Sequence, residues 1–168
     1  MILSKLFTRK PDAASDLYAA IVAGARQEKF YTKLAVPDTL DGRFDMIVLH
    51  IFLVLDRLKG ESESFRQRLT DVFFSDLDRT LREMGVGDLS VSKKIRPMAE
   101  AYAGRIKAYA MAIDQGGAAL VEALQRNVYA GDANPNAKEL ANWMKDIRAK
   151  LAAIPAPKLL AGELDFPL

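Results

Sequence analysis

Apolar residues recur every three or four positions along most of the chain, which is the spacing that places them on one face of an α-helix. Between them, polar and charged residues fill the opposite face. This pattern predicts helices over about 12–28, 41–59, 62–84, 93–114, 117–129 and 135–152. Alternating runs long enough to form strands are absent. The chain is therefore expected to be an all-α, single-domain helical bundle of five to seven helices.

The most apolar run, residues 46–55, is apolar almost all round and is typical of a helix buried in the centre of a bundle. Its ten residues are too few to cross a hydrocarbon layer about 30 Å thick. No targeting segment stands out before it, so the cytoplasm is the expected compartment.

Turn and cap residues divide the pattern further. Thr39 or Asp41 can cap the second predicted helix, Ser62 can cap the third, and the stripe of the third ends at Met84. Residues 86–92 are expected to form a turn. Pro97 then implies that the next helix either begins there or is kinked there.

Three regions follow from this division of the chain. Residues 1–11 are expected to be a flexible N-terminus, and residues 12–154 a single helical domain. The Pro-rich residues 155–168 are expected to be an extended C-terminal tail that lies loosely on the domain.

Composition removes several classes of chemistry. The 168 residues include no cysteine, which excludes disulfides, thiolate nucleophiles and iron–sulfur clusters. One histidine excludes any site that needs two imidazoles, di-iron bundles among them. A net charge of +2 does not favour a general nucleic-acid binder, so DNA is not an expected partner. No P-loop, Gly-x-Gly-x-x-Gly fingerprint or Ser-His-Asp order indicates an enzyme.

The single histidine, His50, lies in the middle of the apolar run. Its simplest interpretation is a buried neutral imidazole that donates one hydrogen bond. The alternatives are a ligand for haem or a metal, a proton shuttle, or part of a cavity that carries haem or a lipid.

Two Asp-x-x-x-Asp pairs, Asp12 with Asp16 and Asp41 with Asp45, would each share one helix face. Facing pairs of this kind hold Mg²⁺ on a diphosphate in helical isoprenoid synthases. Acidic residues also stabilise the first turn of a helix without any ligand, and this interpretation is favoured here.

Other candidates suit binding rather than catalysis. Basic residues gather near the fourth long helix, where they could contact ribosomal RNA, anionic lipid or an acidic partner, or only solvent. They are Lys93, Lys94, Arg96, Arg105 and Lys107. Phe73 and Phe74 are adjacent, so they cannot both point directly into one core. Either one of them lines an apolar groove for a hydrophobic client, or neighbouring helices cover both.

Three stretches occur in a distinctive order between about residues 30 and 110. They are FYTKLAVPDTLDGRFD at 30–45, FFSDLDRTLREMGVGD at 73–88 and VSKKIRPMAEAYAGRIKAY at 91–109. The first of them runs on to His50 and to the segment LDRL. Together they resemble the ubiquinol–cytochrome c chaperone family, the assembly factors of the cytochrome bc1 complex. The short N-terminus resembles a bacterial rather than a mitochondrial member.

This resemblance implies a non-catalytic helical chaperone with no required cofactor, which binds newly made cytochrome b for the bc1 complex. It also implies work near the ribosome exit region and peripheral contact with the anionic surface of the inner membrane. The residues in the matching stretches become candidates for contact with the client or a partner, with charged side chains as a polar rim and aromatic ones as an apolar floor. The charged and polar candidates, together with Phe73 and Phe74, are Asp41, Arg43, Asp45, His50, Arg57, Asp76, Asp78, Lys93, Lys94, Arg96, Tyr102, Arg105 and Lys107.

Overall fold

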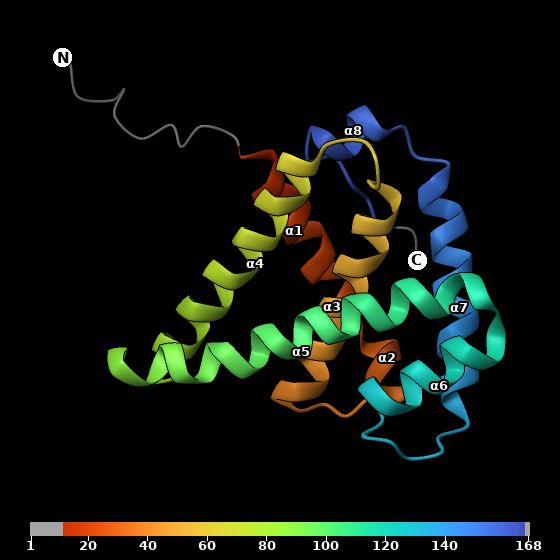
Figure 1. Cartoon of the computed structure of the whole chain (residues 1–168), viewed down its shortest axis with the longest axis horizontal. Coiled ribbons are helices and arrows are strands. Elements are labelled where there is room, and N and C mark those ends of the chain that lie inside the picture. The colour runs from red at the N-terminus through yellow and green to blue at the C-terminus, as the bar shows by residue number, and fades with distance from the viewer. Residues whose placement is uncertain (1–11, 167–168) are drawn as a thin grey trace.

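The computed structural model describes residues 12–166, which form helices joined by turns and loops, without a strand (Figure 1). The predicted flexible segment 1–11 lies outside the described residues. The helices are α1 (Ala13–Ala25), α2 (Glu28–Thr32), α3 (Leu40–Arg57), α4 (Glu63–Glu83), α5 (Asp88–Gln115), α6 (Gly117–Val128), α7 (Asn136–Ala152) and α8 (Ala156–Leu160). The predicted all-α class is confirmed. Each of the six long predicted helices is present, and α2 and α8 are short additions.

Helix α3 is the centre of the fold. It packs against α1, α5, α6 and α7, and most of its side chains from Phe44 to Leu55 are buried. Thr39 caps its start by accepting a hydrogen bond from the Gly42 amide at 3.1 Å. The apolar run therefore forms the buried central helix that its pattern predicts.

Helices α4 and α5 form a long hairpin whose turn projects from the rest of the molecule, at the left of Figure 1. Ser62 caps α4 by accepting from the Phe65 amide at 3.3 Å. Met84, predicted to continue the buried stripe, is instead 60% exposed, because α4 has left the body of the protein at this point.

Helix α5 begins earlier than the sequence predicts. The expected turn at 86–92 ends at Gly87, and the helix runs from Asp88 through Pro97 without a break, so the prediction of a start at Pro97 is wrong. Proline removes one backbone donor from a helix, here the partner of the Lys93 carbonyl. Because the surrounding side chains Lys94 and Arg96 are exposed, this loss falls on the outer face of the helix.

The last described segment differs from the predicted loose extension. Residues 156–160 form α8, and the chain then returns over α1. Leu159 is fully buried and Phe166 is 7% exposed, so both belong to the core. Gly162 makes the return possible, because its backbone lies so close to Ala13 that a Cβ there would be 2.7 Å from the Ala13 carbonyl oxygen.

Candidate functional site

Six of the predicted site residues line one hollowed region, where the start of α3 meets α4, α5 and the end of α6. They are Asp41, Arg43, Asp45, Phe73, Asp76 and Arg105. The region has two hollows of about 510 and 180 Å³, both lined by Phe44 and Met98. We call this region the α3–α5 groove. The larger hollow also contains Asp41, Asp45, Arg105 and Arg126, and the smaller one Leu40, Arg43, Ile47, Phe73, Asp76 and Leu77.

The start of α3 is fixed by a close backbone contact. A Cβ on Gly42 would lie 1.9 Å from the Pro37 carbonyl oxygen, so only glycine allows the preceding loop to fold back against the first turn. Asp41 and Asp45, one helical turn apart, lie on the side of the larger hollow, while Arg43 forms an ion pair with Asp38 at 2.8 Å.

A buried ion pair forms the base of the larger hollow. Arg105 Nε lies 2.7 Å from Asp45 Oδ1, and the two side chains are 21% and 8% exposed. The guanidinium also lies 5.6 Å from the centre of the Phe44 ring and donates to the backbone carbonyls of Ala101 and Asn127. Arg105 thus connects α3, α5 and α6. Burial raises the pKa of Asp45 from 3.8 to about 7, although Arg105 opposes the rise.

The raised pKa predicts a specific effect of Asp45→Asn. Because the folded protein holds this proton more tightly than the unfolded chain, Asp45 contributes stability at low pH that is lost as pH rises from about 4 to 7. Asparagine does not ionise, so the stability of wild type relative to the variant should fall over this range and become constant above it. Urea unfolding from pH 4 to 8 measures this difference, with Asp132→Asn as an exposed control away from the hollow. A constant difference would contradict the assignment.

The smaller hollow has an aromatic floor. Phe73 is 2% exposed and stacks on Tyr102 with ring centres 5.4 Å apart. Phe74 is half-buried and packs edge-on against both rings. Beside them, Tyr18 donates a hydrogen bond to Asp76 at 2.9 Å. Of the two aromatic candidates, Phe73 lines the groove and Phe74 covers the cluster from outside.

Two of the predicted site residues that lie away from the groove, His50 and Arg57, have structural partners. His50 is fully buried and its Nδ1 lies 2.8 Å from the Met46 carbonyl oxygen, to which it donates as a neutral imidazole. Burial lowers its pKa to about 3, in agreement with the favoured interpretation. Arg57 donates to the carbonyls of Leu151 and Ile154, so it satisfies the free carbonyls at the end of α7.

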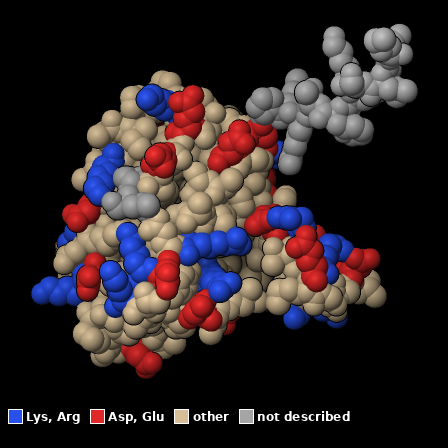
Figure 2. All heavy atoms as spheres, turned by 180° about the vertical axis from the view of Figure 1, so that it is seen from behind, with Lys and Arg blue, Asp and Glu red and all other residues tan. Residues whose placement is uncertain are grey.

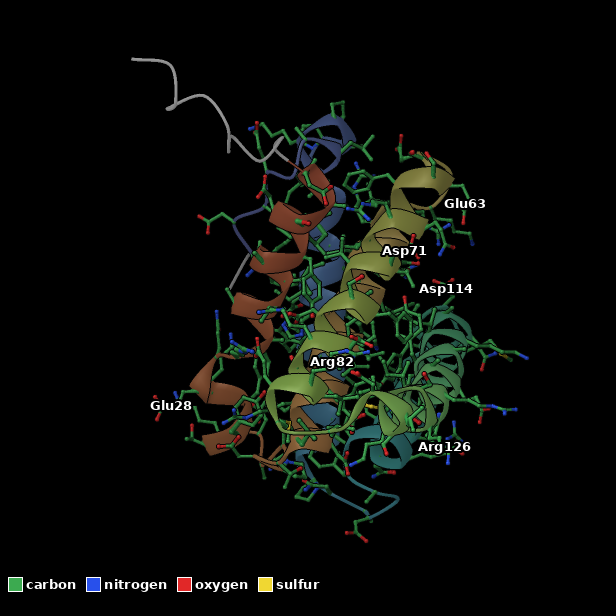
Figure 3. All side chains as sticks on the ribbon, turned by 90° about the vertical axis from the view of Figure 1, so that its left-hand side faces the viewer. Glu28, Glu63, Asp71, Arg82, Asp114 and Arg126 are labelled. Atoms are coloured by element: carbon green, nitrogen blue, oxygen red, sulfur yellow. The ribbon has the colours of Figure 1, made fainter. Side chains whose placement is uncertain are left out.

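The basic candidates on α5 occupy its exposed surface. Lys93, Lys94 and Arg96 lie just after the projecting α4–α5 turn, and Lys107 lies further along. Asp78 on α4 pairs with Arg82 at 2.6 Å, which Figure 3 places close to that turn. Figure 2 shows side chains of both charges on this projection.

The alternative of a magnesium site is not supported. Asp12 accepts hydrogen bonds from Ser15 and Arg68, while Asp45 pairs with Arg105 on another helix. Within residues 12–166, no group of three or more acidic or histidine side chains is arranged to hold a metal ion.

Sequence reasoning missed the apolar part of the groove. Leu77 and Met98 line it, and Leu40 is 47% exposed at its edge. Leu89, in the first turn of α5 at the projecting end of the hairpin, is 90% exposed. The sequence offered one signal for this exposed residue. Leu89 lies in the segment 85–92, which was predicted to be a turn, and it belongs to no predicted apolar stripe.

The chain is similar to proteins with a known role. The family described as ubiquinol-cytochrome C chaperone matches residues 32–166. The ubiquinol-cytochrome-c reductase complex assembly factor 1 of Xenopus laevis is 26% identical over 119 residues, which are 69% of this chain. This chain spans only 60% of that relative's length. A crystal structure of the Cbp3 homolog from Brucella abortus has a TM-score of 0.81 and 39% identity, over 92% of this chain and 88% of that one.

Proposed function

Since the chain belongs to the ubiquinol-cytochrome C chaperone family, we propose that it is a non-catalytic assembly chaperone of the cytochrome bc1 complex. Its client is newly made cytochrome b, which it holds at the cytoplasmic side of the inner membrane. The similarity to an assembly factor of the ubiquinol-cytochrome-c reductase complex supports the first part of this proposal.

The α3–α5 groove is the observation that supports client binding. Its floor is apolar, with Phe44, Ile47, Leu77 and Met98 contributing to it. A transmembrane segment that has not yet been assembled exposes apolar side chains. When such a segment binds in the groove, the apolar surfaces of both are removed from water. Methionine side chains adapt to differently shaped apolar partners, which suits Met98 and the exposed Met84 on the nearby turn.

The rim of the groove is polar. Arg43 and Asp76 border the smaller hollow, and Asp41 and Arg126 border the larger one. An apolar centre surrounded by charges is the usual anatomy of a protein interface. No described helix is long and apolar enough to cross a membrane, so the proposed contact of residues 12–166 with the bilayer is peripheral.

Complementation of a deletion strain tests the proposal. We expect membranes of the strain to lack assembled bc1 complex, and the wild-type gene to restore it. A variant with Leu77→Glu and Met98→Glu should fail, because two carboxylates would then line the apolar floor. Met111→Glu is the matched control, since Met111 is 56% exposed on α5 and does not line the groove.

Normal bc1 complex in the deletion strain would contradict the proposed function. Full restoration by the groove variant, at equal protein level, would contradict only the proposed client site. Circular dichroism of the purified variant separates loss of binding from loss of folding.

The exposed basic residues predict a second contact. Changing Lys93, Lys94 and Arg96 together to glutamate should lower recovery of cytochrome b or membrane lipid in a crosslinking pull-down several-fold. Thermal unfolding should change little, because the three side chains are exposed. Lys138→Glu on α7 is the control. The same pull-down tests the expected contact with the ribosome exit region, and unchanged recovery of every partner would show that these charges only face solvent.

A further inference from the structure

Three aromatic rings from distant parts of the chain meet around His50, apart from the α3–α5 groove. The His50 ring lies 5.0 Å from Trp143, 5.4 Å from Phe30 and 4.8 Å from Phe166, measured between ring centres. Phe30 belongs to α2, Trp143 to α7, and Phe166 follows α8. We call this cluster the His50 cage.

The cage is closed by the last described residues of the chain. In the strap, residues 163–166, Leu164 and Phe166 face inward while Glu163 and Asp165 are exposed. The ring of Phe166 rests on Gly24, where a Cβ would lie 2.9 Å from its Cγ atom. Among the described residues, no hydrogen bond holds residues 164–166 in place. Side-chain packing alone therefore seats this segment.

Phe166 fills the cage but forms no hydrogen bond with the polar atoms that line it. His50 is fully buried, and its Nε2 has no hydrogen-bond partner in the described part of the chain. Trp143 Nε1, a donor, is buried in the same cluster and is likewise unpartnered there. A phenylalanine ring offers neither a donor nor an acceptor, whereas a peptide group or a tyrosine hydroxyl would offer both.

Positive charge gathers beside the cage. The ammonium of Lys29 lies 5.3 Å from the centre of the Phe30 ring and 6.0 Å from that of Trp143. Lys33 follows one turn later in the chain, and Lys150 lies two turns beyond Trp143 on α7. Burial lowers the pKa of Lys29, and the nearby ammonium groups of Lys150 and Lys33 lower it further. Figure 2 shows Lys and Arg side chains on the side of the molecule that faces away in Figure 1, with Asp and Glu side chains among them.

We propose that the His50 cage and its lysines are a docking site for an acidic peptide segment of a partner protein that carries an aromatic anchor. In the free protein the strap occupies this site. Its sequence, Glu-Leu-Asp-Phe, also combines acidic residues with an aromatic one, as the proposed partner segment does. The partner's aromatic residue replaces Phe166, and its acidic residues pair with Lys29 and Lys33. The site is separate from the proposed client groove and does not rest on the proposed function.

Trp143 makes the site measurable, because it is the only tryptophan in the chain. The probe is a synthetic peptide with the sequence of residues 162–168, added to the full-length protein. Phe166→Ala should shift Trp143 emission to the red, and the peptide should reverse the shift. The peptide should bind this variant at least about tenfold more tightly than wild type, in which the strap competes. Phe65→Ala on α4 is the control and should leave the emission unchanged.

The charge requirement is tested separately. A peptide with glutamine and asparagine in place of its two acids should bind the Phe166→Ala protein several-fold more weakly, and Lys33→Glu should weaken the acidic peptide to a similar extent. Lys107→Glu on α5 is the control. Equal binding of the acidic and neutral peptides would overturn the acidic character of the partner.

A further measurement covers the case in which Phe166→Ala unfolds. An excess of peptide should then displace the strap of the wild-type protein and change the access of iodide to Trp143. If the peptide changes neither emission nor quenching in any of these proteins, the docking site is overturned.

Discussion

Replacing Gly42 with alanine is expected to lower the free energy of unfolding by about 3 kcal/mol or more. The added methyl group would lie 1.9 Å from the Pro37 carbonyl oxygen and 2.9 Å from its carbonyl carbon. Both atoms are backbone, so no side-chain rotation relieves the overlap. The first turn of α3 or the loop before it must move, which weakens the hydrogen bond from the Gly42 amide to Thr39.

Urea unfolding followed by circular dichroism measures this effect, and Gly104→Ala is its matched control. Gly104 lies in the middle of α5, and nothing is within 4 Å of the position of its Cβ. Alanine there should stabilise the protein by up to about 1 kcal/mol, because glycine is a poor residue inside a helix. Equal unfolding midpoints for the two variants would show that the loop before α3 is not held as described.

Phe73→Ala is expected to cost about 3–5 kcal/mol of stability, the usual range for a buried phenylalanine. Its ring contacts those of Tyr18, Phe44, Phe74 and Tyr102 and is 2% exposed. These neighbours come from α1, α3, α4 and α5, so little collapse can fill the space left behind. The same change enlarges the smaller hollow of the groove.

Phe74→Ala provides the comparison, because it removes the same number of atoms from the neighbouring position. Phe74 is half-buried, so its loss should cost less than half as much. Denaturant unfolding of both variants measures the two costs. A larger cost for Phe74 would reverse the assignment of the inward-facing ring.

Periodicity predicted the long helices well because each buries one continuous stripe. It failed where an element depends on residues far away in the chain. Phe166 looked like part of a loose tail, yet it packs on Gly24 and His50, which come more than a hundred positions earlier. Gly87 and Asp88 suggested a turn, although the same residue types also begin helices.

The groove shows the same limit. The family resemblance placed Asp45 and Arg105 among the candidates, but not as partners, because sixty positions separate them and no local pattern connects them. His50 and Arg57 were candidates for the same reason. In the structure His50 is hydrogen-bonded to the Met46 carbonyl inside the core, and Arg57 donates to a carbonyl at the end of α7. Met84 and Leu89 are exposed because the α4–α5 hairpin projects from the body of the protein. The pattern within either helix alone does not predict this projection.

Helix α3 carries both Asp45, at the groove, and His50, in the cage, only about 7.5 Å apart along one rigid axis. A small rotation or shift of this helix would therefore move residues of the groove and of the cage together. If a segment bound at one site favours one position of α3, thermodynamic reciprocity requires that occupancy of the other site change its affinity by the same factor. Binding of a client in the groove and binding of a peptide in the cage would then both depend on the position of α3.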